Sequence, residues 1–191
     1  MADKHTVYVT EPDVIDMQAL ARLLLEPDYV LQAGAVTFES ADPEAVKTLV
    51  IRSETIIRDD IKQYFPAVQS VVRIGTGLDN VDLAYCSAAG IHVFNAPGAN
   101  ADAVAEYVVA VVLAARRRLH LLSESDVQSW NRFKFSGHGI GGRSVGIIGY
   151  GNIGRLLHQK LQGLGCRRFM IYDPYVSEEQ ATAAGVELVP L

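Results

Sequence analysis

The chain has 191 residues, a net charge of −5 and 49% hydrophobic residues, which suits one large domain or two small ones with packed cores. The acidic balance and the lack of a signal peptide or membrane-length apolar run give no reason to expect nucleic acid or a membrane as a partner. Cys86 and Cys166 do not have the spacing of a metal site, so we expect no metal and a reduced, cytoplasmic compartment.

The first half of the chain alternates short β-rich runs with helical patterns. Strands are predicted at 6–10, 49–52, 70–74 and 91–95, and helices at 12–24, 45–49, 59–65 and 81–89. Prolines at 12 and 43 suit a first helical turn, and Gly90 is a typical residue after a helix end. This alternation predicts a parallel sheet with helices on both faces, an α/β domain of flavodoxin-like type over residues 1–98.

A turn-rich segment at 96–100 interrupts the pattern, and we place a domain boundary there. A long helix is expected over 102–119, and its middle is apolar nearly all round, which indicates burial between domains or subunits. The second run has strands at 144–149 and 168–172 and helices at 152–164 and 177–184. Residues 99–191 therefore read as the first part of a Rossmann nucleotide-binding domain, with only two strands evident.

A glycine-rich turn, Gly149-Tyr150-Gly151-Asn152-Ile153-Gly154, leaves the first of these strands and enters a helix. Gly149 would permit the tight turn, Gly151 the approach of a pyrophosphate to the main chain, and Gly154 close packing of helix and strand. The helix N-terminus offers unpaired N–H groups to the phosphates.

The second strand of this half ends at Asp173, 19 residues after Gly154. A carboxylate at this distance accepts hydrogen bonds from an adenosine ribose and repels a 2′-phosphate, which favours NAD over NADP. Arg155 is expected on the helix surface or at the pyrophosphate.

Four motifs occur in an order more specific than any one of them: 50–55, 73–82, 95–107 and the glycine turn with Asp173. Together they resemble the D-isomer-specific 2-hydroxyacid dehydrogenases, and within them most closely the phosphoglycerate dehydrogenase branch. The resemblance implies hydride transfer between NAD and a small D-2-hydroxy acid, with 3-phosphoglycerate as the best guess. Erythronate-4-phosphate dehydrogenases share the segments at 96–98 and 149–154 and remain an alternative.

The resemblance also implies roles for residues in the first domain. Arg52 and Ser53 would contact the substrate, because a guanidinium suits a phosphate. Main-chain amides at Gly75, Thr76 and Gly77 would hold the substrate carboxylate, and Thr76 would also touch the nicotinamide. The plainer alternatives are a surface cation at residue 52 and an ordinary turn at the glycines.

On the cofactor side, the resemblance implies that the amides of Asn152 and Ile153 bind the pyrophosphate and that Asp173 binds the ribose. It also implies a homodimer formed through the long helix, 102–119. The family's catalytic Arg, Glu and His are expected beyond residue 191, so we assign no catalytic residue to this chain and expect it to be inactive alone. We place His158 on the surface. A truncated, non-catalytic nucleotide-binding or dimerisation module is therefore a second hypothesis.

Overall fold

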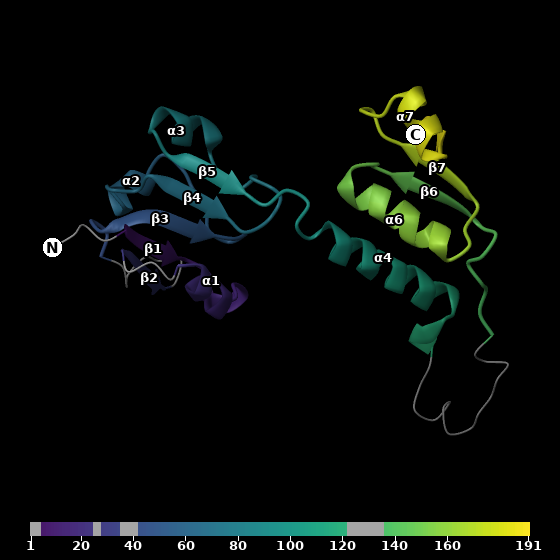
Figure 1. The fold of residues 1–191 in the computed structure, drawn as a ribbon, viewed down its shortest axis with the longest axis horizontal. Helices are drawn as coiled ribbons and strands as arrows, with labels where there is room; N and C mark the ends of the chain where they lie inside the picture. Colours follow the sequence, from purple (N-terminus) through teal and green to yellow (C-terminus); the bar gives the residue numbers. More distant parts are fainter. Residues whose placement is uncertain (1–4, 25–27, 35–41, 122–135) are drawn as a thin grey trace, which may run out of the picture. The chain divides into compact units, whose positions relative to one another are not determined.

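The structure is a computed structural model that describes residues 5–24, 28–34, 42–121 and 136–191. The chain divides into two compact units, Met1–Ala99 and Asn100–Leu191, and Figure 1 shows a sheet with its own helices in each. Both sheets are parallel, which confirms the predicted α/β class.

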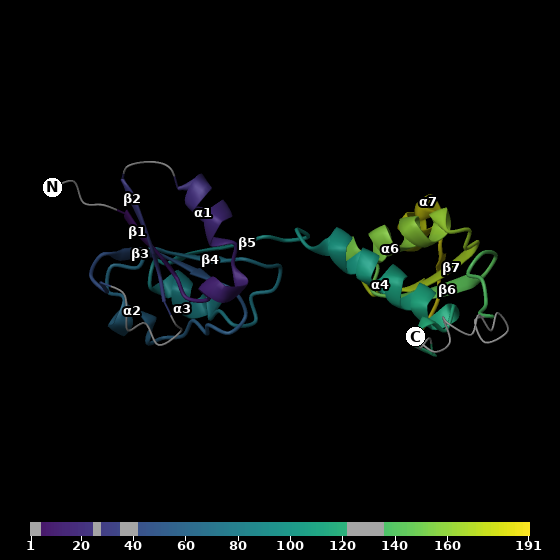
Figure 2. The ribbon, with the colours of Figure 1, turned by 90° about the horizontal axis from the view of Figure 1, so that it is seen from below.

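Unit 1 contains a five-stranded sheet with the order β2-β1-β3-β4-β5. Its strands are β1 (His5–Val9), β2 (Tyr29–Ala33), β3 (Val46–Ile51), β4 (Ser70–Arg73) and β5 (His92–Asn95). Its helices are η1 (Pro12–Val14), α1 (Met17–Leu23), α2 (Ile61–Tyr64) and α3 (Leu83–Ala88). Figures 1 and 2 show α1 on one face of the sheet and α2 and α3 on the other.

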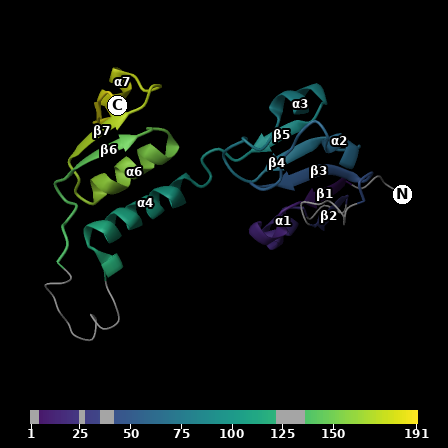
Figure 3. The ribbon, with the colours of Figure 1, turned by 180° about the vertical axis from the view of Figure 1, so that it is seen from behind.

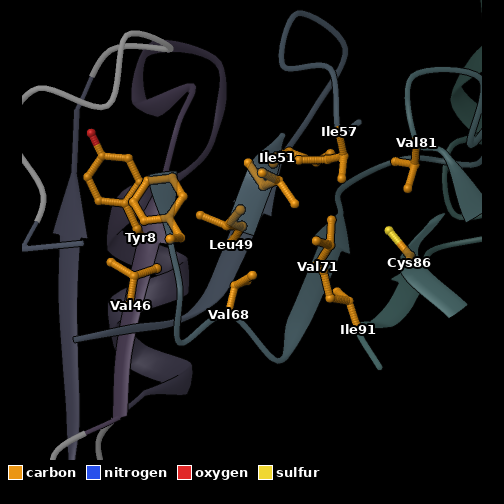
Figure 4. Close-up of a cluster of buried hydrophobic side chains, with 12 residues drawn as sticks. Tyr8, Val46, Leu49, Ile51, Ile57, Val68, Val71, Val81, Cys86 and Ile91 are labelled. Carbon is orange, nitrogen blue, oxygen red and sulfur yellow. The ribbon is translucent and has the colours of Figure 1, made fainter. Parts of the chain in front are cut away.

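Alternation along the strands builds a core on each face of this sheet. Val7, Val9 and Val50 pack towards α1 in one buried cluster. Tyr8 and Leu49 point the opposite way, into the larger cluster shown in Figure 4. Because successive side chains of a strand face opposite sides, a slip of one residue in register would exchange the two cores.

Two predictions for unit 1 are wrong. Residues 45–49 do not form a helix, because Val46 begins strand β3 and is fully buried between its neighbours. The sequence analysis also missed β2, which pairs with β1 from Tyr29 onward. In both cases strand pairing and burial decide the conformation, which a local helix-start signal cannot anticipate.

The helix expected over 12–24 is interrupted. Residues Pro12–Val14 form a short 3-10 turn, Ile15 is extended and buried, and α1 starts again after Asp16. The Asp16 carboxylate accepts a hydrogen bond of 2.9 Å from the N–H of Ala19, so a second cap inside the pattern starts a new helix.

Unit 2 contains a three-stranded sheet with the order β6-β7-β8. Its strands are β6 (Ser144–Ile148), β7 (Arg168–Tyr172) and β8 (Glu187–Leu188), and its helices are α4 (Ala101–Arg116), η2 (Leu119–Leu121), α6 (Asn152–Gly163) and α7 (Glu178–Ala184). The expectation of two strands is therefore wrong by one, since β8 is too short to be recognised in the sequence. Ile147 and Ile171 pack into one core with residues from α4, α6 and α7.

Helix α4 lies beside α6, as Figures 1 and 3 show. Lys160 on α6 forms ion pairs with Asp102 at 2.9 Å and Glu106 at 3.5 Å on α4. Within this chain α4 is not buried all round, because Tyr107 is 70% exposed and Val111 is 48% exposed. None of the described helices is long and apolar enough to cross a membrane.

A buried carboxylate fixes the loop that follows β3. Glu11 comes directly after β1 and is only 6% exposed. It accepts hydrogen bonds of 2.9–3.1 Å from the consecutive main-chain N–H groups of Arg52, Ser53, Glu54 and Thr55. Burial by itself would raise the pKa of Glu11, but these bonds, with one from the Thr55 hydroxyl, lower it from its usual 4.5 to about 2.

This depressed pKa predicts an acid-dependent loss of stability. Glu11 titrates lower in the folded chain than in the unfolded one, so its stabilising effect is complete above about pH 4.5 and disappears as the pH falls towards 2. The difference corresponds to about 3 kcal/mol. Between about pH 5 and pH 3, the Glu11→Gln variant should therefore lose less of its free energy of unfolding than the wild type.

The measurement is urea unfolding followed through NMR signals of β3 at several pH values. Asp13→Asn is the control, because it removes an exposed carboxylate two residues away and should retain the wild-type slope. Equal slopes for the wild type and Glu11→Gln would contradict the prediction.

Candidate functional site

The predicted substrate residues of unit 1 lie on loops at the carboxyl ends of adjacent strands. Arg52 follows β3, and the glycine segment 75–77 follows β4. The glycine segment is joined to the loop after β5, because the Asn95 side chain donates to the Thr76 carbonyl at 2.7 Å and the Ala96 N–H donates to the Gly75 carbonyl at 2.9 Å. Parallel strands bring these loops to one edge, which is where open α/β sheets bind ligands.

Arg52 and Ser53 are both exposed at this edge. The Arg52 guanidinium donates to the carbonyl of Val14 at 3.0 Å, and the Arg73 side chain donates to the carbonyl of Arg52 at 3.3 Å. Two arginines, Arg52 and Arg73, therefore lie at the same loop. Only Arg52 was assigned a role from the sequence.

The glycine segment after β4 is shaped by its neighbours. Gly75 has a φ of +156°, and a Cβ atom there would overlap the guanidinium of Arg73. A Cβ atom at Gly77 would lie 2.7 Å from the Asp79 carboxylate. In both cases the overlapping atoms are the ends of flexible side chains, which would have to move to admit a Cβ atom, and Thr76 between the two glycines is exposed.

In unit 2 the second glycine turn joins β6 to α6. Gly149 adopts a φ of +90°, in the left-handed region that favours glycine. A Cβ atom at Gly154 would overlap the carbonyl oxygen of Gly149, so this position requires close packing. A Cβ atom at Gly151 would meet nothing within 4 Å, which leaves open space in front of the first turn of α6. Asn152 and Ile153 begin that helix, whose first N–H groups have no partner within it.

The Asp173 carboxylate lies directly against this turn. Its two oxygens accept hydrogen bonds from the N–H of Tyr150 at 2.7 Å and from the N–H of Tyr175 at 2.8 Å. These two bonds, the Tyr150 bond first, lower the pKa of Asp173. Beside it lies a cavity of about 260 Å³, lined by Tyr172, Asp173, Glu178, Leu188, Val189 and Pro190. The turn, the helix start and the acid are thus brought together within one unit.

His158 is not on the surface, and that expectation is wrong. It is 5% exposed, its Nδ1 lies 2.7 Å from the Tyr150 hydroxyl, and its ring packs against Phe169 at 4.3 Å between centroids. Burial lowers its pKa. The guanidinium of Arg155, an exposed residue on the helix surface as expected, lies 4.9 Å from the centre of the Tyr150 ring. Two residues of α6 thus contact the tyrosine of the glycine turn.

Two residues that organise this edge of unit 1 were not predicted from the sequence. Glu11 holds the main-chain N–H groups of residues 52–55, and Asn80 donates to the carbonyls of Arg52 at 2.9 Å and Thr55 at 2.6 Å. Asn80 belongs to a motif that was recognised, but nothing local in the sequence connects Glu11 with a loop about forty residues later.

Comparisons with known proteins agree with this geometry. The family model of the D-isomer specific 2-hydroxyacid dehydrogenase catalytic domain matches residues 13–189. The D-3-phosphoglycerate dehydrogenase of Mycobacterium tuberculosis is 39% identical over 153 residues, which are 80% of this chain and 29% of that protein. The chain thus spans less than a third of this relative's length.

Solved structures show the same fold. The apo form of D-lactate dehydrogenase from Escherichia coli superposes with a TM-score of 0.75 at 24% identity, over 97% of this chain and 60% of that one. D-lactate dehydrogenase from Aquifex aeolicus, solved with NAD and lactic acid, gives a TM-score of 0.74 at 18% identity, over 97% and 56%. Because the family model matches most of this chain, the chain belongs to the D-isomer specific 2-hydroxyacid dehydrogenase family.

Proposed function

We propose that this chain binds NAD and a small D-2-hydroxy acid for reversible hydride transfer at the C2 carbon of the acid, with 3-phosphoglycerate as the substrate. The main support is the contact between the Asp173 carboxylate and the N–H of Tyr150 at 2.7 Å. This contact brings a sugar-binding acid next to a phosphate-binding helix start, and a dinucleotide needs both.

The residues of unit 2 fit the cofactor. The open space at Gly151 admits a pyrophosphate to the N–H groups of Asn152 and Ile153. Each carboxylate oxygen of Asp173 already accepts one main-chain hydrogen bond, and each can accept another from a ribose hydroxyl. When bound, NAD supplies the carbon that accepts or donates the hydride.

The phosphate preference rests on Arg52 and on the relatives. Arg52 is exposed on a loop whose main chain is tightly held, and a guanidinium recognises a phosphate through paired hydrogen bonds. The similarity to D-3-phosphoglycerate dehydrogenases over 80% of this chain supports the same substrate.

A non-catalytic nucleotide-binding or dimerisation module is the second candidate, and the exposed apolar residues of α4 favour it. The two functions differ in substrate binding. The purified chain should bind 3-phosphoglycerate as well as NAD if it contributes both sites of a dehydrogenase, whereas binding of NAD without binding of 3-phosphoglycerate would support the module.

The cofactor assignment predicts the effect of changing Asp173. In Asp173→Asn the charged acceptor for the ribose hydroxyls is lost, so the dissociation constant for NAD should rise about ten- to a hundredfold. Isothermal titration of the chain with NAD measures this. Glu178→Gln is the matched control, since Glu178 lines the same cavity and belongs to α7. An equal loss in both variants would contradict a specific ribose contact.

The substrate assignment predicts that Arg52→Ala weakens binding of 3-phosphoglycerate about tenfold or more, because a charged pair with the phosphate disappears. Binding of the unphosphorylated D-glycerate should change less. Arg22→Ala is the control, since Arg22 is an exposed cation in the last turn of α1 and lies outside the loops at this edge. NMR titration gives both affinities, and an unchanged affinity of Arg52→Ala for the phosphorylated acid would remove the assignment.

We further propose that two copies of the chain associate through α4, because its exposed Tyr107 and Val111 are apolar side chains that association would bury. In Val111→Asp a charge would enter that interface, so the dimer should dissociate in sedimentation equilibrium. Leu23→Asp, at the exposed end of α1, is the control and should remain dimeric. A wild-type chain that is monomeric at micromolar concentration would contradict the proposal.

A further inference from the structure

The loop that carries Arg52 and Ser53 is held from two sides by buried side chains. Glu11 accepts four consecutive main-chain N–H groups, those of residues 52–55. Asn80, itself 8% exposed, donates to the carbonyls at the two ends of the same segment, Arg52 and Thr55. Six hydrogen bonds to two side chains therefore fix the main chain of a loop whose first two side chains are exposed.

We propose that Glu11 and Asn80 are positioning residues for the substrate, and that they restrict recognition of its anionic group at this loop to the side chains of Arg52 and Ser53. The inference rests on the proposed function, because it takes the substrate to bind at this loop.

The main chain of the loop cannot serve as the anion-binding group. Consecutive N–H groups on a turn commonly form a concave site for a phosphate or carboxylate. Here the Glu11 carboxylate already occupies that site with both oxygens. A ligand anion that approaches the loop therefore finds the side chains and no free main-chain donor at residues 52–55.

The charge of Glu11 makes Arg52 more necessary. A carboxylate of low pKa behind the loop keeps a negative charge near the bound anion, and an anion in such a place needs a cation to offset the repulsion. The Arg52 guanidinium, oriented by its bond to the Val14 carbonyl, is the cation that the fixed loop presents.

The test combines amide exchange with a double-mutant cycle on the full chain. In Glu11→Gln the side-chain NH₂ would face main-chain N–H groups, so the amide protons of residues 52–55 should exchange at least tenfold faster by NMR. The dissociation constant for 3-phosphoglycerate should rise about tenfold in Glu11→Gln and should not rise further when Glu11→Gln is added to Arg52→Ala. Asp13→Asn is the matched control and should change neither quantity.

A merely structural role for Glu11 would give a different pattern. In that case Glu11→Gln would weaken binding of 3-phosphoglycerate by the same factor in the wild type and in Arg52→Ala, and that result would overturn the proposal. Unchanged amide exchange at residues 52–55 would overturn it too. If Glu11→Gln fails to fold, Asn80→Ala provides the second arm, since it removes the amide donor from both carbonyls and leaves Glu11 in place. The same loss of coupling to Arg52 is expected. If the wild-type chain binds no 3-phosphoglycerate, the substrate assignment fails, while the exchange rates still decide whether the two side chains hold the loop.

Discussion

A carboxylate that follows one parallel strand and binds the main chain after the neighbouring strand organises each unit of this protein. In unit 1 Glu11 follows β1 and holds the loop after β3. In unit 2 Asp173 follows β7 and holds the turn after β6. Parallel strands end at the same edge of a sheet, so a short acidic side chain there can reach the next loop. This shared geometry determines which groups each edge offers to a ligand.

The two carboxylates differ in what remains available. Glu11 is buried and accepts five hydrogen bonds from the loop that it holds, so it has no capacity left for a ligand. Asp173 is less buried and accepts one hydrogen bond on each oxygen, which leaves lone pairs directed elsewhere. The same interaction therefore produces, in unit 1, an acid that acts only through the loop it holds and, in unit 2, an acid with lone pairs left for a ligand.

Local signals in the sequence were sufficient for the glycine turn of unit 2. The strand, glycine turn and helix around Gly149 and Gly154 have the conformations that their residue types require, and Asp173 reaches the turn. Local signals failed where distant contacts decide. The helix-start pattern before Val46 predicts a helix, but strand pairing makes this segment part of β3. His158 is buried because Tyr150 and Phe169 cover it. Glu11 binds a loop about forty residues later, and no local pattern in the sequence indicates this contact.

The contact between Asp173 and the glycine turn has a consequence for coenzyme engineering. Replacing this acid with a small or basic residue is the obvious way to admit a 2′-phosphate and convert an NAD enzyme to NADP. Here the same replacement would also deprive the amides of residues 150 and 175 of their acceptor, so the glycine turn that we propose as the pyrophosphate site would loosen. A successful redesign would need a substitute acceptor for the amide of residue 150, because the side chain proposed to select the coenzyme also holds the turn.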